Sequence, residues 1–338
     1  MEASLPEGVP LDDIRLVPDQ DVPLPHDVNI GLVLEMGGWP DRDSSTFARK
    51  VEPLMRGYAK VFREFRLTGD FMTELDPAWK PYAHQCRYLF QTYYCAAGAM
   101  RSMLASSKDL DGFILLQADG YVNPRRIINL PRDAIWLQKR PDLGPGAACR
   151  HVARPPSNGP DAGFTEYMWY TMRIDTLNSE LTQIEAIERF WSKQLDKGYL
   201  KPDANGHFPL NRTHVIWDDI KYVPAAAAQE FMELADDAHE LGLFHEIGTP
   251  AILHTLMQHR GTECYEMDSA GTPGDAVYWQ DMRPSDAGHK LFCEFPFHIH
   301  MAAYILYDLP YEGPQDLNEA YPKEWDANRP VERDPDRD

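Results

Sequence analysis

The segment Val28–Met36, VNIGLVLEM, is a near-continuous apolar run followed by Gly37-Gly38-Trp39-Pro40. Apolar runs without alternation are typical of strands buried on both faces, and such strands occur in parallel sheets covered by helices. The Gly-Gly pair predicts a sharp turn where the strand ends. A strand of this kind constrains the chain to an architecture in which other layers cover both sides of a sheet.

Further apolar runs and helical patterns alternate along the chain. Strands are predicted at residues 61–67, 113–116, 134–138 and 214–217, and helices at 44–62, 88–107 and 177–195, with a helix-rich stretch at 224–260. The Gly- and Pro-rich stretch at 140–163 predicts a long loop or lid. Interleaved strands and helices indicate an α/β fold with a central, mostly parallel sheet flanked by helices.

Composition narrows the classes of partner. The chain has 338 residues, 43% of them apolar, and a formal net charge of −20. That charge argues against nucleic acid or an anionic membrane surface as a partner, because binding to phosphate backbones depends on clustered Lys and Arg. No apolar stretch reaches the ~18 residues of a membrane span. We therefore expect a soluble protein, either cytoplasmic or lumenal in the secretory pathway.

The acidic charge is concentrated at the two ends. Residues 1–26 and 311–338 are rich in Pro and charge and poor in core-forming residues, so we predict tails on either side of one domain at 27–310. Five cysteines are scattered without a CxxC spacing, which argues against a zinc ribbon or a dense disulfide framework and leaves room for one or two disulfides.

The stretch Gly112–Pro124, GFILLQADGYVNP, is a buried-strand pattern that ends on Asp119-Gly120. In open α/β sheets, ligands lie beyond the carboxyl ends of the strands. An acid at that end could hold a divalent cation against a diphosphate, and the glycine would let the backbone pass close to the ligand. The alternative is that Asp119-Gly120 is simply a turn.

Several short motifs in order along residues 28 to 300 resemble a large, poorly characterised eukaryotic and algal family of glycosyltransferases with the GT-A fold. The matching residues are Gly112-Phe113, Asp119, Asn123-Pro124, Asp219, Tyr222-Val223-Pro224, Phe244-His245-Glu246-Ile247 and Pro250. The resemblance implies a GT-A-like, Rossmann-related fold and a nucleotide-sugar donor, with Asp119 as metal ligand and Asn123 near the nucleotide sugar.

The chain departs from the family pattern at one position. With Asn123-Pro124 as the anchor, the family's paired acids fall on Ala118 and Asp119, so the first acid is missing. We expect a weakened site for Mn²⁺ or Mg²⁺, in which the diphosphate and waters supply other oxygens, or none at all. Arg125, Arg126 or Lys290 could instead neutralise the leaving phosphate.

Two histidine-containing segments lie late in the chain. His289-Lys290 stands in a polar context and is the preferred phosphate-binding candidate. His298-Ile299-His300 lies in an apolar run, where histidines are more often structural, although HxH can bind a metal when both side chains share one face of a strand. A metal-dependent hydrolase that uses His298 and His300 is the weakest of the functions considered.

Three further residues are candidates for ligand contact. Trp39, after the first strand, could stack on the nucleobase or act as a packing plug. Arg87, placed at the start of a predicted helix, could reach the diphosphate or be an ordinary surface residue. Asp219 could contact the acceptor, and the alternative of capping a helix fits less well because Pro224 is a natural first-turn residue.

Glu246 is the predicted general base. It stands between Phe244 and Ile247 and before Gly248-Thr249-Pro250, which predicts an apolar strand or turn. Partial desolvation there would raise the pKa of a carboxyl toward that of a useful base. The alternatives are an ion pair with a nearby Arg or the capping of the following helix.

Together these residues predict transfer of a sugar from a UDP- or GDP-sugar to a hydroxyl of a glycan or other acceptor. Glu246 and Asp219 are the predicted catalytic residues. The alternative is a catalytically silent GT-A-like domain that binds a glycan or a protein, which the missing acid at Ala118 supports.

Overall fold

The computed structural model describes residues 28–36, 44–45, 48, 52–71, 74–88, 90–118, 120–122, 127, 130–138, 149, 181–202, 219–267, 269–270 and 298–300. The predicted tails at 1–26 and 311–338 lie outside these residues, as do the strand at 214–217 and, apart from Cys149, the loop at 140–163. In the part that is described, no helix is both long and apolar enough to cross a membrane.

A seven-stranded sheet forms the centre of the molecule, with strand order β3-β2-β1-β4-β7-β6-β8. The strands are β1 (Val28–Glu35), β2 (Phe62–Gly69), β3 (Ala83–Gln85), β4 (Gly112–Gln117), β6 (Ile135–Gln138), β7 (Ile220–Pro224) and β8 (Cys264–Met267). Of these seven, β7 alone runs antiparallel to its neighbours β4 and β6. The predicted α/β class with a central, mostly parallel sheet is therefore confirmed.

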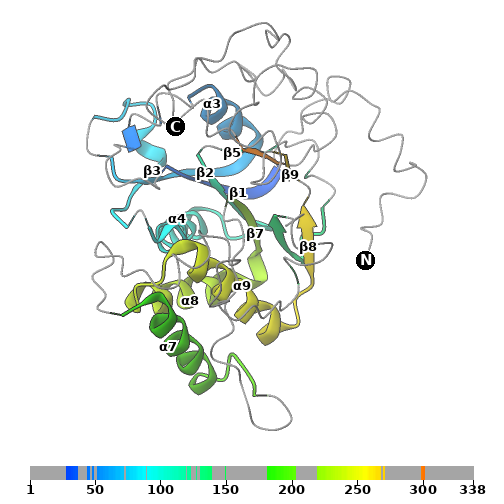
Figure 1. Ribbon diagram of the computed structural model, residues 1–338. Helices are drawn as coiled ribbons and strands as arrows, with labels where there is room; N and C mark the ends of the chain where they lie inside the picture. The colour runs from blue at the N-terminus through cyan, green and yellow to red at the C-terminus, as the bar shows by residue number, and fades with distance from the viewer. Residues whose placement is uncertain are drawn as a thin grey trace, which may run out of the picture.

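Helices cover both faces of this sheet (Figure 1). The helix α3 (Glu52–Val61) lies on one face, and α4 (Thr92–Ser106), α7 (Gln183–Asp196), α8 (Ala228–Glu240) and α9 (His245–Arg260) lie on the other. The predicted helices at 44–62, 88–107 and 177–195 are found with shorter bounds. The predicted helix-rich stretch at 224–260 is also found: it contains α8 and α9, which residues 241–244 separate, although Pro224 itself is the last residue of β7.

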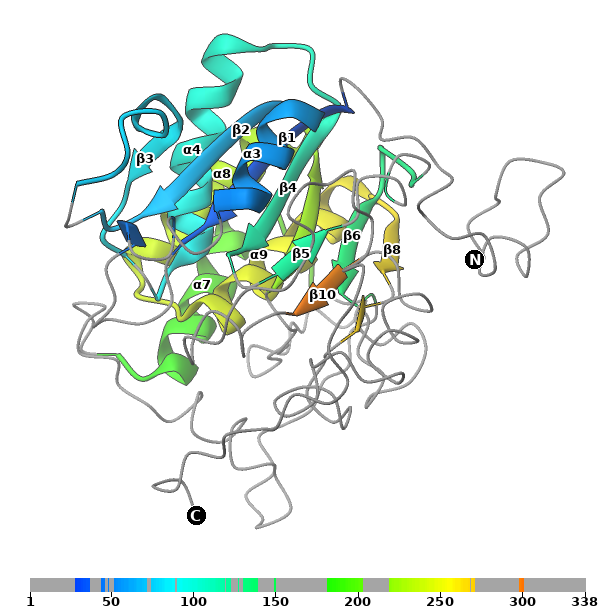
Figure 2. The same ribbon diagram turned by 90° about the horizontal axis from the view of Figure 1, so that it is seen from above.

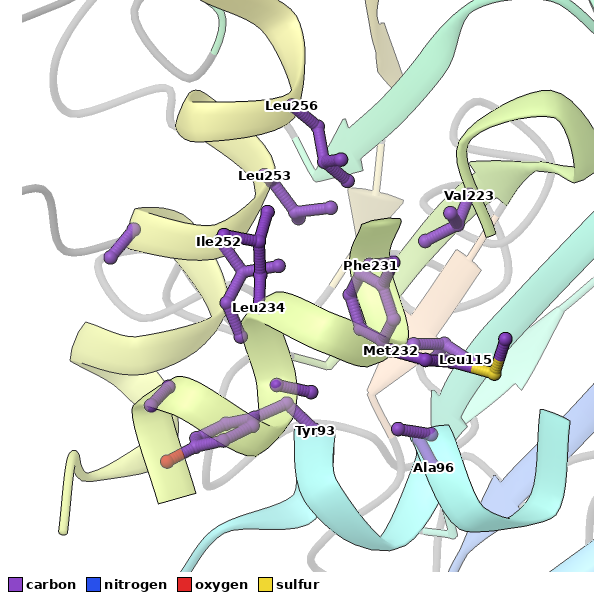
Figure 3. Packing of buried hydrophobic residues seen from close by; sticks show 14 of the residues in the cluster. Tyr93, Ala96, Leu115, Val223, Phe231, Met232, Leu234, Ile252, Leu253 and Leu256 are labelled. Atoms are coloured by element: carbon purple, nitrogen blue, oxygen red, sulfur yellow. The ribbon is translucent and has the colours of Figure 1, made fainter. Parts of the chain in front are cut away.

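The two faces carry two hydrophobic clusters because strand side chains alternate in direction. On β4, Ile114 and Leu116 belong to the cluster under α3, whereas Phe113 and Leu115 belong to the cluster under the other helices. Figure 3 shows the second cluster, in which side chains of α4, α8 and α9 meet Leu115 of β4 and Val223 of β7. Burial on both faces explains why β1 and β4 are apolar runs without alternation.

A second, three-stranded sheet follows the end of β4 (Figure 2). Its order is β5-β10-β9, formed by Gly120–Val122, His298–His300 and Ser269–Ala270. The backbone N–H of Val122 donates to the hydroxyl of Tyr58 on α3 at 3.0 Å. This bond anchors β5 to the main body of the protein.

Local sequence signals account for the ends of two helices. Thr182 and Glu185 form a capping box at the start of α7, in which each side chain accepts from the other residue's backbone N–H. Gly261 ends α9 in the left-handed conformation, with φ of 66°, which glycine adopts without strain.

The glycine at the start of β4 leaves room for a tyrosine. A Cβ on Gly112 would lie 2.3 Å from the hydroxyl of Tyr222, which donates to the carbonyls of Asp111 and Arg132. Tyr222 also stacks on Trp136 of β6, with ring centroids 3.8 Å apart. These contacts join β4, β7 and β6 on the α3 face.

A buried carboxylate joins α7 to α8. Asp237 accepts hydrogen bonds from Gln194 and Lys197 and pairs with Lys193. Burial by itself raises the pKa of Asp237, but the hydrogen bonds from Lys197, Gln194 and Lys193 outweigh it and hold the pKa below its ordinary value of 3.8. Asp237 therefore stabilises the fold in its ionised form.

We predict that Asp237→Asn lowers the free energy of unfolding at pH 7 by about 1.5–3 kcal/mol, the range for hydrogen bonds to charged groups. Because the folded pKa is depressed, this stabilisation is complete above the unfolded pKa and is lost as pH falls through the folded pKa. Urea unfolding of both proteins between pH 7 and pH 2 should show the difference shrinking with acid. Asp196→Asn, at the exposed end of α7, is the control, and a pH-independent difference would contradict the prediction.

Candidate functional site

The carboxyl edge of the sheet gathers polar residues among apolar strands. Glu35 ends β1, Gln117 ends β4, Thr68 precedes the last residue of β2, and Asp219 directly precedes the antiparallel β7. Glu35 is in register with both Thr68 and Gln117. Glu35, Thr68 and Asp219 are buried. This is the edge at which α/β folds bind ligands.

Glu35 and Lys221 form a fully buried ion pair at this edge. Their side chains are 1% and 0% exposed, and the Lys221 Nζ donates to Glu35 Oε2 at 3.2 Å. The sequence analysis identified neither residue. Two local signals could have identified them. Glu35 ends an apolar run, VLE, and Lys221 stands inside another, IKYV.

Asp219 lies beside the end of β4. The backbone N–H of Gln117 donates to the carbonyl of Asp219 at 2.8 Å, and the N–H of Ala118 donates to the carbonyl of Glu35 at 2.9 Å. Asp219 precedes a strand, so the alternative that it caps a helix is wrong. The motif that contains Tyr222 forms β7, which the sequence analysis did not predict as a strand.

Ala118 belongs to the hydrophobic cluster on the α3 face and is 4% exposed. It stands where the family pattern has its first acid. A carboxylate at this position would be buried among apolar side chains, which costs several kcal/mol unless it is paired. Ala118 therefore contributes to the hydrophobic core at the position where the resemblance would place an acid.

The histidine segment lies alongside the residues that follow Asp119 in the sequence. Strand β10 pairs antiparallel with β5, so that His300 is opposite Gly120 and His298 is opposite Val122 (Figure 2). From the sequence alone, His298 and His300 were interpreted as structural rather than metal-binding, and no connection with Asp119 was predicted. The pairing joins segments more than 170 residues apart, and a local pattern cannot reveal it.

Arg87 lies in a short segment between β3 and α4. The helix begins at Thr92, so the prediction that Arg87 starts the helix is wrong; Gln91 takes the N-cap position instead. A disulfide between Cys86 and Cys95 closes this segment onto α4. Arg87 itself is exposed.

Glu246 lies in the first turn of α9 and is partly exposed. The predicted strand or turn is therefore wrong at this position. Gly248 and Pro250 suggested a turn, but the helix accommodates both; Pro250 lacks an N–H and cannot donate to the Glu246 carbonyl. A carboxylate in the first turn of a helix interacts favourably with the positive end of the helix dipole.

A backbone hydrogen bond joins the segment that carries Arg87 to the start of the helix that carries Glu246. The N–H of His245 donates to the carbonyl of Phe90 at 2.9 Å, which joins the start of α9 to the segment that carries Arg87. Both segments lie toward the carboxyl edge of the sheet. The segment with Arg87 follows the carboxyl end of β3, and α8 leads back to this edge after the antiparallel β7.

Three aromatic rings pack where this segment meets the end of α8. Tyr94 stacks on His239 with ring centroids 3.7 Å apart, and Tyr88, which is 40% exposed, packs edge-on against both rings. The Nδ1 of His239 lies 2.7 Å from Gln91 Oε1. Burial lowers the pKa of His239, although Asp236 opposes the shift. His239 is therefore neutral at pH 7 and donates its Nδ1 proton to Gln91.

Five of the predicted site residues lie outside the described residues, so their roles stay predictions: Trp39, Asp119, Asn123, His289 and Lys290. The side chains of His298 and His300 are also not described. Within the described ranges, no group of three or more His, Cys, Asp or Glu side chains could hold a metal ion.

Comparisons with known proteins give a weak structural likeness. No protein-family model matches the sequence, and no curated protein matches it. The fold is similar to a glycosyltransferase involved in the glycosylation of the major capsid of PBCV-1, with 9% identity and a TM-score of 0.34 over 80% of this chain and 94% of that chain.

Two other solved structures show similar values. The bifunctional glycosyltransferase WbbM matches at 10% identity and a TM-score of 0.36 over 82% of this chain and 46% of its own. Mouse xyloside xylosyltransferase 1 matches at 11% identity and a TM-score of 0.31 over 80% of this chain and 97% of its own. Likeness at this level does not define a reaction or a substrate.

We predict that the double variant Cys86→Ala/Cys95→Ala lowers the free energy of unfolding by about 2–3 kcal/mol, as expected for a short closed loop. The second disulfide, Cys149–Cys264, spans 115 residues rather than 9, so its removal should cost more, about 4–5 kcal/mol. Urea unfolding of both double variants measures the two losses. Equal stability of the first variant and the wild type would contradict the prediction.

Proposed function

We propose that the chain is a GT-A-like glycosyltransferase that moves a sugar from a nucleotide-diphosphate sugar to an acceptor hydroxyl. The observation that carries the proposal is the setting of the β4–β5 turn. Ala118, on one side of Asp119 in the sequence, is bonded to β1, and Gly120, on the other side, is opposite His300. Asp119 thus stands in the sequence between two residues placed at the edge where ligands bind, and one of them, Gly120, is paired with the histidine segment.

In this proposal, Asp119 holds the donor diphosphate. Carboxylate oxygens suit Mn²⁺, so Asp119 would supply one ligand to that ion, a histidine of β10 is a candidate for another, and a bound cation would neutralise phosphate charge. Arg87, Asn123, His289 and Lys290 contact the diphosphate or sugar, and Trp39 stacks on the nucleobase. In the sequence, Trp39 follows β1, Arg87 follows β3 and Asn123 follows β5.

The proposed reaction is a direct displacement. The oxygen of the acceptor hydroxyl forms a bond to the anomeric carbon as the bond from that carbon to the diphosphate oxygen breaks. Glu246 accepts the hydroxyl proton, and the nucleotide diphosphate leaves. The position of Glu246 in the first turn of α9 supports this role because the side chain is partly exposed there. Asp219 is proposed to orient the acceptor.

A catalytically silent domain that binds a glycan or a protein is the second candidate. Ala118 supports it, because this residue is buried in the α3-side cluster and leaves only one acid in the motif. The two candidates differ in one property: a transferase hydrolyses or transfers its donor sugar, whereas a silent domain binds without turnover.

We infer an oxidising compartment from the two disulfides. Cys86–Cys95 and Cys149–Cys264 connect residues of the described core. Structural disulfides persist in secretory and extracellular environments and are rare in the cytosol. Of the two compartments that the sequence left open, this observation supports the secretory pathway.

We predict that Asp119→Asn weakens nucleotide-diphosphate binding by roughly 10- to 100-fold, because contacts to charged groups contribute about 1.5–3 kcal/mol. A thermal-shift screen of nucleotide diphosphates with and without Mn²⁺ measures this, since a ligand that binds only the folded state raises Tm. Asp109→Asn makes the same change at the opposite end of β4, where the side chain is exposed, and should bind normally.

The screen also tests the proposed function itself. If no nucleotide diphosphate at millimolar concentration raises the Tm of the wild-type protein, the proposal fails. If Asp119→Asn and wild type bind equally well, Asp119 is only a turn residue. Either result is clear because the apo Tm of Asp119→Asn should match that of the wild type.

We predict that Glu246→Gln lowers turnover by roughly 10²–10⁴-fold, the usual contribution of a general base, with donor affinity nearly unchanged. Glutamine keeps the shape of the side chain but cannot accept the proton. Donor dissociation constant, Tm and turnover should be measured on the same preparation, with the exposed Glu74→Gln as control.

Two other outcomes would reassign Glu246. A variant that is less stable but equally active per folded molecule would show a structural role. A parallel fall in donor affinity and turnover would show that Glu246 holds the donor sugar, as in a retaining mechanism.

A further inference from the structure

We propose that the buried Glu35–Lys221 ion pair positions the carboxyl ends of β1, β4 and β7, and with them the turn that carries Asp119. Both side chains are almost fully buried, and the Nζ and Oε2 atoms are 3.2 Å apart. The pair would act on the site through the strands and would not itself touch the substrate. Its role is therefore that of a positioning element.

The ion pair spans the strand that leads to Asp119. Strands β1 and β7 are the two neighbours of β4, so the contact between Glu35 and Lys221 crosses over β4. The residues next to them, Leu34 and Ile220, belong to the cluster on the α3 face. By alternation, Glu35 and Lys221 lie on the face covered by α4, α8 and α9.

Backbone bonds connect this pair to the turn. The carbonyl of Glu35 accepts from the N–H of Ala118, and the carbonyl of Asp219, two residues before Lys221, accepts from the N–H of Gln117. The last two residues before Asp119 are thus bonded to the two strands that the ion pair joins. Movement of either strand end would move the turn.

Energetics favour positioning over stability as the reason for the pair. Two charges lose their hydration when they are buried, and well-packed apolar residues of similar volume often stabilise a protein as well or better. A buried pair has one property that an apolar contact lacks: its donor and acceptor must stay within hydrogen-bonding distance, because separating them leaves unsatisfied buried groups at a cost of several kcal/mol. It therefore fixes how far apart the ends of β1 and β7 lie.

The test is amide hydrogen exchange in Glu35→Leu/Lys221→Met, which keeps side-chain volume and removes both charges. We expect exchange at Gln117 and Ala118 to become roughly three- to tenfold faster, as for the loss of one hydrogen bond. The Asp111 N–H, which donates to the Asn29 carbonyl at the other end of β1 and β4, is the internal reference and should not change. A purely structural role would raise exchange at all three amides.

Two further variants complete the test. Glu35→Gln/Lys221→Gln keeps a hydrogen bond without charge and should restore slow exchange at Gln117 and Ala118. Arg101→Met/Asp236→Asn removes an exposed ion pair between α4 and α8 and should leave all three amides unchanged. If the Leu/Met variant does not fold, Glu35→Asp shortens the carboxylate by one methylene and should give the same local increase.

Unchanged exchange at Gln117 and Ala118 in the variant that folds overturns the inference, as does an equal increase at Asp111. A second measurement, which rests on the proposed function, is the dissociation constant of the nucleotide diphosphate that shifts wild-type Tm. It should rise in the Leu/Met variant and recover in the Gln/Gln variant. If no nucleotide binds the wild type, the exchange result still decides the positioning role by itself.

Discussion

Glu35 and Lys221 form an ion pair on the face of the sheet that α4, α8 and α9 cover. Both side chains are almost fully buried there, so water does not screen their charges. This pair makes the arrangement of β1, β4 and β7 specific. A one-residue slip of β1 or β7 would turn its charged side chain to the other face and leave an unpaired charge in the α3-side cluster. Apolar strands alone tolerate such slips more easily, since Val, Leu and Ile side chains occupy both faces of β1 and β4.

The reversed direction of β7 determines which segments meet at the carboxyl edge. Because β7 runs back to the amino edge, α8 returns the chain, and α9 begins near the end of β3. The contact between His245 and Phe90 results from this path. Arg87, Asp219 and Glu246 are far apart in the sequence, but they occupy one side of the molecule because one strand is antiparallel.

The sequence predicts what local patterns determine. Strands β1 and β4 follow from apolar runs, and α7 follows from helical spacing, although the capping box at Thr182 starts the helix at Gln183 rather than at residue 177. The strand β7 was missed because Lys221 interrupts its apolar pattern, and its partner Glu35 is 186 residues away. Glu246 was misplaced because Gly248 and Pro250 are turn signals, whereas packing of α9 against α4, α7 and α8 outweighs them. The pairing of β10 with β5 has no local signal.

The Glu35–Lys221 ion pair also limits how the proposed donor site could neutralise the negative charge of a diphosphate. Lys221 is a cation only two residues from Asp219 in the sequence. Its charge is already balanced by Glu35, and its side chain is 0% exposed. A diphosphate at this edge therefore needs positive charge from another source, since an uncompensated anion beside Asp219 would be repelled. Arg87 is exposed at the same edge, and a divalent cation is the alternative. Because the buried Ala118 has no side-chain oxygen, a cation in the proposed site would have one carboxylate ligand fewer, and Arg87 or a β10 histidine would have to contribute more.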